Sequence, residues 1–234
     1  MDKNARSSPS FPLAGRVAIV TGATRGIGRA IAIHLHSLGA RVTLNYVSSS
    51  SEAELLASEL NASSQQNSAI SVRADVSWTQ SIHLYPRLHL EDFEKTFRTN
   101  TRGAFVCCKE AAKRVVRGGG GRIIMMSTSQ VGALSPGYGV YTASKAAVET
   151  MVRVLAKELK GSQITANCVA PGPVATEMFY AGKSDETVKM LASACPMGRI
   201  GEPKDVAEIV GFLAGDGGEW INGQVIRANG GFVV

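Results

Sequence analysis

The segment RVAIVTGATRGIGRAIAIHLHSLGARVTLNY, residues 16–46, decides the fold of this chain. An apolar, β-branched run at 16–21 leads into a glycine turn, and apolar residues then recur at helical spacing over 27–38. Gly39 ends this helix, and a second apolar run follows directly at 41–46. Strand, glycine turn, helix and strand within about 30 residues are typical of a βαβ unit.

The remaining sequence repeats this alternation of apolar runs and helical patterns. Strands are expected at 68–76, 122–127, 163–170 and 224–229, helices at 52–60, 91–117, 141–160 and 203–214, and a lid-like stretch at about 174–200. Parallel strands with helical crossovers place helices on both faces of an open sheet. We therefore predict an α/β fold with a Rossmann-like, doubly wound parallel sheet. It forms one domain at 13–234, preceded by a flexible tail at 1–12.

The composition excludes several classes of protein. The 234 residues are 44% hydrophobic and 19% charged, which is enough for a sizeable core. The net charge of +6 suits an anionic ligand, but the basic residues are scattered, which argues against nucleic acid as a partner. The four cysteines show no disulfide-framework spacing and no CxxC pair, so we expect a reduced, intracellular protein without a metal site. No apolar stretch approaches the roughly 18 residues of a membrane helix, so no membrane partner is expected.

The glycine loop TGATRGIG joins the first strand to the first helix. Glycines at these positions permit a tight turn and let the backbone approach a pyrophosphate, whose charge is met by the helix N-terminus. A plain strand–helix turn is the alternative, but the position after the first strand favours a dinucleotide site. The candidate cofactor contacts in this loop are Gly22, Thr24, Arg25, Gly26, Ile27 and Gly28.

The second strand favours NADPH over NADH. An acidic residue there would bind the adenosine ribose of NAD, but no Asp or Glu occurs between Gly28 and Glu52, and the strand ends in Asn45-Tyr46. Arg25 can face a 2′-phosphate instead, although a solvated loop cation is its alternative role. We therefore expect NADPH/NADP+ as cofactor, with Asn45 among its contacts.

Tyr141 and Lys145, in YTASK, are four residues apart and share one face of a helix. A free tyrosine titrates near 10, and a neighbouring ammonium stabilises the phenolate, which would make Tyr141 a usable acid or base near neutral pH. Such pairs are also common on solvated helices, so the context decides. Upstream lies the hydroxyl cluster Ser127-Thr128-Ser129, at the sheet edge where ligands of open α/β sheets bind.

These elements resemble the short-chain dehydrogenase/reductase family, with the closest likeness to its plant NADPH-dependent aldehyde reductases. The resemblance covers about 13–76 and 90–234. It rests on three segments: STSQVGALSPGYGVYTASKAAVE, ELKGSQITANCVAPGPVATEM and EWINGQVIRANGG.

The resemblance implies a role for each matching residue. Tyr141 would be the general acid in carbonyl reduction, and Lys145 would lower its pKa while holding the nicotinamide ribose. Asn100, in FRTNTRGAF, resembles the asparagine that orders a proton-relay water. The implied cofactor contacts are Tyr141 and Lys145 themselves, Asp75-Val76 at the adenine, and Pro171, Gly172, Val174 and Thr176 around the nicotinamide.

The catalytic hydroxyl is ambiguous from sequence. The family places it 13 or, less often, 14 residues before the tyrosine, which here are Thr128 and Ser127. Ser129 fits if the loop is one residue shorter. We favour Ser127, with Ser129 second, while backbone capping at the strand end is the alternative role for any of the three.

The chain departs from the family pattern between Asp75 and Asn100. Only 25 positions separate these residues, whereas the family usually has roughly twice that number. The shortage falls on a helix, the fourth strand and an Asn-Asn-Ala-Gly-type cofactor loop, so the inner edges of the sheet should be unpaired. SIHLY at 81–85 could supply a replacement strand. Alternatively, the chain is a truncated variant or a flawed gene model that folds poorly.

The resulting hypothesis is an NADPH-dependent reductase of small aldehydes or ketones. The rival class is a catalytically impaired protein with a nucleotide-binding or interaction role, and an alcohol dehydrogenase working in the oxidative direction is a further alternative. The helices at 91–117 and 141–160 are expected to form a homodimer or homotetramer interface, as in the family. We expect a cytoplasmic location, with the plastid as the other possibility.

Overall fold

The computed structural model describes residues 11–64, 68–75 and 89–234. Its strands are β1 (Val17–Val20), β2 (Arg41–Tyr46), β3 (Ala69–Arg73), β4 (Arg122–Met126), β5 (Thr165–Pro171) and β6 (Val225–Ala228). Its longer helices are α1 (Gly26–Ser37), α2 (Ser50–Ala62), α3 (Leu90–Phe97), α4 (Gly103–Arg114), α6 (Gly139–Glu158), α8 (Asp185–Ser193) and α9 (Pro203–Ala214). Short elements complete the set: the π-helical turn η2 (Arg98–Arg102), α5 (Gln130–Ala133), α7 (Glu177–Tyr180) and the 3-10 turn η3 (Asp216–Gly218). The predicted α/β alternation is confirmed.

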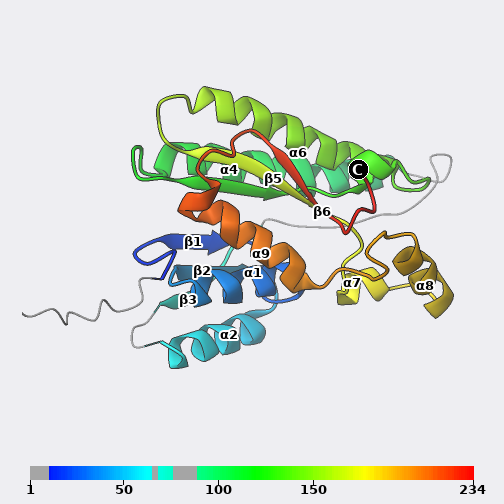
Figure 1. Cartoon of the computed structure of the whole chain (residues 1–234), viewed down its shortest axis with the longest axis horizontal. Coiled ribbons are helices and arrows are strands. Elements are labelled where there is room, and N and C mark those ends of the chain that lie inside the picture. Colours follow the sequence, from blue (N-terminus) through cyan, green and yellow to red (C-terminus); the bar gives the residue numbers. More distant parts are fainter. Residues whose placement is uncertain (1–10, 65–67, 76–88) are drawn as a thin grey trace, which may run out of the picture.

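The strands form two parallel three-stranded sheets, ordered β1–β2–β3 and β4–β5–β6. Figure 1 shows α1 and α2 beside the first sheet and α4 and α6 beside the second. Among the described residues, neither β1 nor β4 pairs with a second neighbouring strand. Val17 and Ile19 of β1 are 60% and 74% exposed, which is unusual for the first strand of such a fold.

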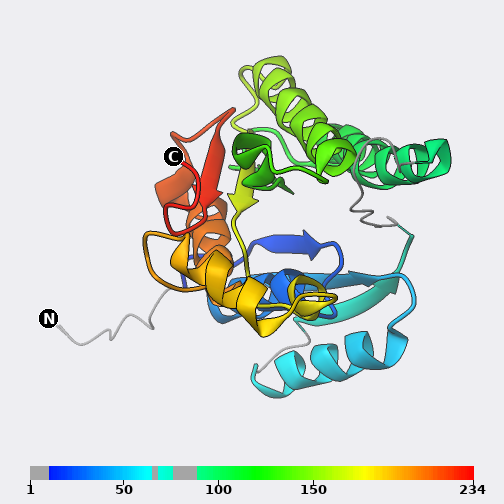
Figure 2. The same cartoon turned by 90° about the vertical axis from the view of Figure 1, so that its right-hand side faces the viewer.

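This division is the predicted consequence of the shortened region before Asn100. A parallel sheet without its inner strand ends in two edges, and the turned view in Figure 2 shows the two groups of strands set apart. The proposed replacement strand at 81–85 lies outside the described residues. So does most of the predicted tail at 1–12, which stays a prediction.

The two halves are joined by α9, which packs on α1 on one side and on β4 and β5 on the other. The approach to α1 is close: a Cβ added at Gly211 would lie 2.5 Å from His34 Nε2. One hydrophobic core accordingly includes Leu44 of β2, Val169 of β5 and Val210 of α9. A second core lies between β4, β5, α4 and α6.

A polar link also spans the two halves next to the unpaired edges. Arg16, just before β1, donates a hydrogen bond from Nη1 to the Gly120 carbonyl oxygen at 3.0 Å, just before β4. Its guanidinium also pairs with Asp216. The halves therefore form one domain although their strands are not continuous.

Replacing residues 78–89 with the longer segment of a family member should raise the melting temperature by at least about 3 °C, roughly 1 kcal/mol for a chain of this size. The physical reason is that a strand between β1 and β4 would pair their backbone groups and cover Val17 and Ile19. Thermal unfolding followed by circular dichroism measures the change. The control graft carries two prolines in its strand, and equal melting temperatures for both grafts would contradict the prediction.

Candidate active site

The glycine loop has the backbone geometry that a phosphate contact requires. Gly22 and Gly26 have positive φ values of 63° and 53°. A Cβ added at Gly28 would lie 2.2 Å from the Gly22 carbonyl oxygen, so the turn closes only with glycine there. The first turn of α1 contains no acidic residue. Its amide groups, between Thr24 and Gly28, therefore suit an anion.

Contacts from other strand ends surround this loop. The amide of Ala23 donates to the Asn45 carbonyl oxygen at 3.0 Å, which ties the loop to the end of β2. The Asn45 side chain is buried and donates from Nδ2 to the Ala74 carbonyl oxygen at 2.9 Å, next to Asp75. From the other half of the molecule, Thr176 Cγ2 would lie 3.3 Å from a Cβ at Gly26. The predicted cofactor residues of both halves thus meet at one sheet edge.

A hollow of about 280 Å³ lies beside the end of β2. It is lined by Tyr46, Val47, Ser48, Ser50 and Arg73. Arg73 Nε donates to the Val47 carbonyl oxygen at 3.0 Å, and the two serines stand at the start of α2. Sequence reasoning assigned no binding role to Arg73 or to these serines. The available signal was a hydroxyl-rich run directly after the strand that lacks the expected acid.

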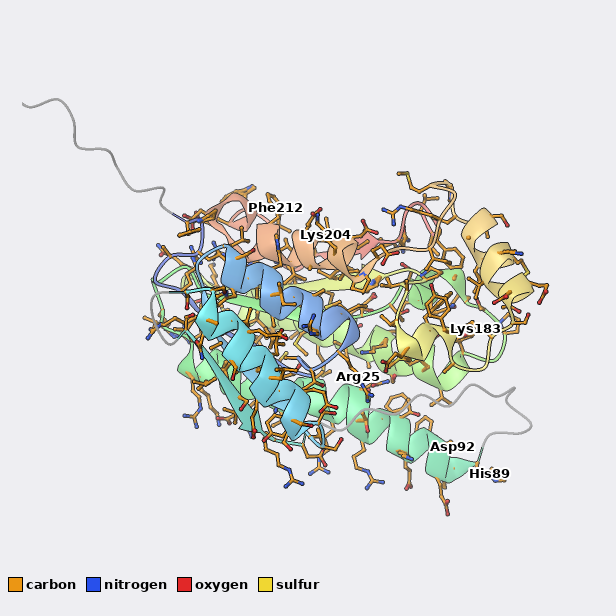
Figure 3. All side chains as sticks on the ribbon, turned by 90° about the horizontal axis from the view of Figure 1, so that it is seen from below. Arg25, His89, Asp92, Lys183, Lys204 and Phe212 are labelled. Carbon is orange, nitrogen blue, oxygen red and sulfur yellow. The ribbon has the colours of Figure 1, made fainter. Side chains whose placement is uncertain are left out.

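Arg25 is exposed at the start of α1, where Figure 3 labels it. Its Nη1 lies 3.9 Å from Glu177 Oε2 of α7, and both side chains are more than 70% exposed. An exposed pair at this distance contributes little stability, so the guanidinium is available to an anionic ligand.

Tyr141 and Lys145 lie on the predicted face of α6, and both are partly buried next to the end of β4. Burial raises the pKa of Tyr141 above its ordinary value, while a hydrogen bond with Thr128 acts in the opposite direction. Lys145 Nζ donates to the Met126 carbonyl oxygen at 3.0 Å, and burial lowers the pKa of this lysine to about 8. The pKa shift of Tyr141 is caused by burial, by the hydrogen bond with Thr128 and by the nearby Tyr138. The expected lowering of the Tyr141 pKa by Lys145 stays a prediction.

The three hydroxyls after β4 have different partners. Ser127 Oγ donates to Glu149 Oε1 at 2.6 Å, and Ser129 Oγ donates to the Ala170 carbonyl oxygen at 3.0 Å. Thr128 is close enough to Tyr141 for a hydrogen bond with it to be one of the causes of the Tyr141 pKa shift, and its Oγ1 also accepts from the Gln130 amide at 3.2 Å. The preference for Ser127, with Ser129 second, stays a prediction, because a hydroxyl that donates to one group can still accept from another.

Asn100 is buried in the π-helical turn η2, and π turns are frequent at functional sites. Its Nδ2 donates to Ser144 Oγ at 2.9 Å, and Ser144 Oγ donates to the Tyr141 carbonyl oxygen at 2.7 Å. Its Oδ1 has no hydrogen-bond partner among the described residues. This oxygen can accept from one ordered water, which fits the predicted relay role.

The predicted nicotinamide contacts follow β5. Gly172 approaches Asn229 so closely that a Cβ would lie 2.8 Å from Asn229 Cβ. Val174 is buried and bridges to Gly201, while Thr176 caps α7 by accepting from the Phe179 amide at 3.2 Å. Pro171, the last residue of β5, accepts from the Ser129 amide at 2.8 Å. Asp75 is exposed at the end of β3, and Val76 lies outside the described residues.

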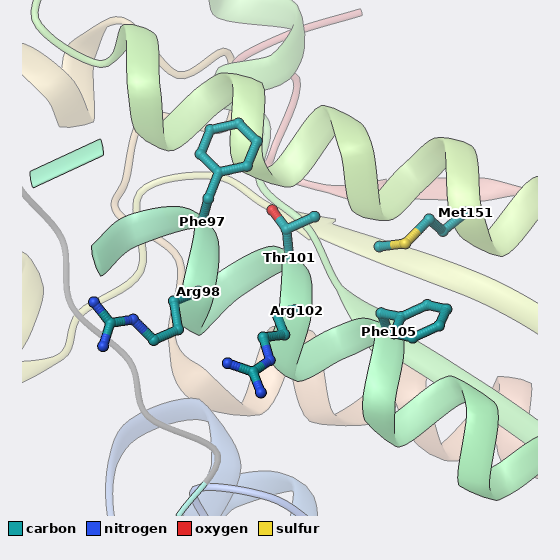
Figure 4. Close-up of a pocket in the computed structure, with 6 residues that line it drawn as sticks. All are labelled: Phe97, Arg98, Thr101, Arg102, Phe105 and Met151. Atoms are coloured by element: carbon teal, nitrogen blue, oxygen red, sulfur yellow. The ribbon is translucent and has the colours of Figure 1, made fainter. Parts of the chain in front are cut away.

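A second hollow, of about 430 Å³, lies on the outer face of α4 and α6. Its lining consists of Phe97, Arg98, Thr101, Arg102, Phe105 and Met151. Figure 4 shows Phe97, Phe105 and Met151 close to the α6 side, with Arg98 and Arg102 extending the other way. These are the helices that the sequence assigns to an oligomer interface. In the part of the chain that the structure describes, no cluster of side chains suited to a metal ion is found. No described helix is long and apolar enough to cross a bilayer.

The fold and the residues at the carboxyl ends of its strands define a class of protein. It is a Rossmann-type dinucleotide-binding protein with a tyrosine–lysine pair on α6. Two family models match the chain, "short chain dehydrogenase" over residues 16–86 and "Enoyl-(Acyl carrier protein) reductase" over residues 83–233. The chain belongs to the short-chain dehydrogenase/reductase family, and the resemblance drawn from the sequence is confirmed.

Curated relatives resemble the chain over nearly their whole length. An Arabidopsis thaliana protein named "NADPH-dependent aldehyde reductase-like protein, chloroplastic" is 53% identical over 263 residues, covering 97% of each chain. "NADPH-dependent aldehyde reductase 2, chloroplastic", also from Arabidopsis thaliana, is 51% identical and covers 96% of each. Both matches extend beyond 234 positions, so each contains gaps in this chain, as the predicted shortening requires.

Solved structures of the family superpose closely. A blue fluorescent protein from a metagenomic library, in complex with NADPH, gives a TM-score of 0.88 at 31% identity and covers 95% of this chain and all of its own. The angucycline C-6 ketoreductase LanV with bound NADP gives 0.86 at 27% identity, covering 94% and 96%.

Lys145→Met should change how stability depends on pH. The folded-state pKa of Lys145, about 8, lies below its ordinary value of 10.5, so the unfolded chain binds more protons between these values. This difference in proton binding makes the parent more stable as the pH rises from about 8 to 10.5. Lys145→Met lacks the titrating group and therefore lacks this effect. The melting temperature of the parent minus that of the variant should therefore increase from pH 7 to pH 10 by about 3 °C or more.

Lys157→Met is the matched control, because Lys157 is exposed near the end of the same helix. The melting temperature of the parent minus that of Lys157→Met should stay constant over the same pH range. A constant difference for Lys145→Met would show that burial does not depress the pKa of that ammonium.

Proposed function

We propose that this chain reduces the carbonyl group of small aldehydes or ketones to an alcohol with NADPH. The observation that carries the proposal is the partly buried tyrosine–lysine pair on α6, in which Lys145 is held at the end of β4 and Thr128 is close enough to affect the pKa of Tyr141. The relatives named as NADPH-dependent aldehyde reductases support both the cofactor and the class of reaction.

The residues present fit NADPH. The turn that only glycine permits at Gly28 leaves the α1 amides open to a pyrophosphate. Arg25 and the hollow with Ser48, Ser50 and Arg73 provide cations and hydroxyls for a 2′-phosphate. Thr176 and the segment after β5 lie where the nicotinamide would be held. When bound, the cofactor supplies the hydride that reduces the carbonyl carbon.

Tyr141 provides the proton in this proposal. Burial keeps its pKa above the ordinary value, so the phenol is protonated at neutral pH and can donate to the carbonyl oxygen. A hydrogen bond with Thr128 acts against this rise in the Tyr141 pKa. Lys145, with a pKa of about 8, remains largely protonated at pH 7 and can stabilise the phenolate that the transfer leaves.

The lid favours an apolar substrate. Met178 of α7 and Met190 of α8 are 47% and 60% exposed, and Phe179 stands between them in sequence. Lys183 donates to the Phe179 carbonyl oxygen at 2.7 Å and lies 5.0 Å from the centre of the Phe179 ring. The lid therefore presents methionine and aromatic side chains, and the ammonium of Lys183 is already engaged with Phe179.

The division of the sheet supports the rival hypothesis of a catalytically impaired nucleotide-binding protein. The unpaired edges of β1 and β4 lie beside the glycine loop and the Ser127–Ser129 cluster. NADPH binding without turnover over a broad aldehyde panel would favour that rival. Preferred oxidation of alcohols with NADP+ would favour an alcohol dehydrogenase.

Assembly and location are part of the same proposal. The face with Phe97, Phe105 and Met151 is a suitable surface for a homodimer or homotetramer, because it combines apolar side chains with a shallow hollow. A plastid location is consistent with the names of the Arabidopsis relatives, and a cytoplasmic location is the other proposal.

Tyr141→Phe should lower kcat for carbonyl reduction at least about a hundredfold, because it removes the general acid. NADPH affinity should change little. Steady-state NADPH oxidation and fluorescence titration measure the two quantities. Tyr138→Phe, whose ring lies 6.5 Å away, should retain most of the turnover. Near-normal turnover in Tyr141→Phe would remove this residue from the mechanism.

Arg25→Ala should raise the KM for NADPH roughly tenfold or more and change that for NADH much less, because only NADPH carries the 2′-phosphate. Arg29→Ala is the matched control: Arg29 lies one turn further along α1 and pairs with Glu59 at 3.1 Å. Equal losses for both cofactors in Arg25→Ala would show that Arg25 does not discriminate between them.

A further inference from the structure

Glu149 is a buried carboxylate that the proposed mechanism does not use. Its side chain is 8% exposed and lies on α6, four residues after Lys145 and eight after Tyr141, so the three share one face of the helix. Its Oε1 accepts from Ser127 Oγ at 2.6 Å, and its Oε2 lies 3.6 Å from Arg153 Nη2, which is half exposed.

The hydrogen bond from Ser127 to Glu149 is short. Bonds from a hydroxyl to a carboxylate are typically about 2.5–2.7 Å long and stronger than neutral ones. A buried carboxylate also loses its hydration, so its hydrogen-bond donors are costly to remove. The Ser127 hydroxyl is therefore held firmly by Glu149 and serves as its buried donor.

The Glu149–Ser127 bond belongs to a set of three contacts between α6 and consecutive residues at the end of β4. The pairs are Lys145 with the Met126 carbonyl oxygen, Glu149 with Ser127, and Tyr141 with Thr128. On the other side, the Ser127 amide donates to the Val169 carbonyl oxygen of β5 at 2.7 Å. Ser127 is thus fixed to β5 through its backbone and to α6 through its side chain, directly before Thr128.

We propose that Glu149 is a positioning residue for carbonyl reduction: by holding Ser127, it fixes the end of β4 against the face of α6 that carries Tyr141 and Lys145. The proposal rests on the proposed function and adds a residue that acts through Ser127. Without the bond, the end of β4 is free to shift relative to α6, and with it the surroundings of the Tyr141 phenol.

Three substitutions at position 149 separate the hydrogen bond from the charge. Glu149→Gln keeps an acceptor oxygen at the same reach without the charge. Glu149→Asp keeps the charge but is one methylene shorter, so it draws the acceptor away from Ser127. Glu149→Ala removes both. Glu158→Ala, an exposed carboxylate at the end of the same helix, is the control.

Glu149→Asp and Glu149→Ala should lower kcat roughly tenfold with the KM for NADPH little changed, as expected for a misplaced catalytic group. The alkaline limb of their kcat profile should move to higher pH, because the bond from Thr128 lowers the pKa of Tyr141. Glu149→Gln should restore the parent rate and profile. Ser127→Ala should match Glu149→Ala, and the double variant should be no worse than either.

Parent-like kcat and pH profile in Glu149→Asp, or a Gln variant as impaired as the Ala variant, would overturn the proposal. If Glu149→Ala does not fold, the Gln, Asp and Ser127→Ala variants still decide it. Nuclear magnetic resonance of ring-¹³C-tyrosine protein separates this inference from the proposed function. The Tyr141 resonance, assigned with Tyr141→Phe, should move in Glu149→Asp and not in Glu149→Gln, even if the parent proves inactive. An unmoved resonance in Glu149→Asp would contradict the positioning role.

Discussion

The seating of α6 on the carboxyl end of β4 is the contact on which the site depends. β5 is buried along its whole length, and it fixes β4 through the amides of Ser127 and Ser129. α6 then reaches the same strand end with successive turns of one face. α6 packs against this strand end. Its helical backbone keeps Tyr141 and Lys145 in a fixed relation to each other.

Packing between helices and strands also connects the two half-sheets that the described residues form. The residues of the candidate active site divide between two half-sheets, and packing rather than strand pairing holds these together. α9 contacts both halves, and Arg16 links the starts of β1 and β4. Gly26 of one half and Thr176 of the other therefore still meet, while Val17 and Ile19 of β1 stay exposed.

Burial gives the site its chemistry at the expense of stability. Burial lowers the pKa of the Lys145 ammonium to about 8, which makes its charged form less stable in the folded protein, and it keeps the Tyr141 phenol protonated at neutral pH. The carboxylate of Glu149 is buried in the same region, and it is compensated by a short hydrogen bond and a nearby guanidinium. These polar groups are concentrated where two hydrophobic cores meet the sheet edge.

The sequence alone determined what local periodicity and spacing encode. The apolar runs located every described strand, with β2 matching at both ends, and the four-residue spacing placed Tyr141 and Lys145 on one helix face. The count of residues before Asn100 predicted the divided sheet. Tertiary structure decided that Glu149 holds Ser127, that Thr128 lies near Tyr141, and that Arg73 joins the serines after β2. These contacts join elements that are far apart in the chain. Their distances depend on how a strand end packs against a helix, and the spacing of residues along the sequence does not encode that packing.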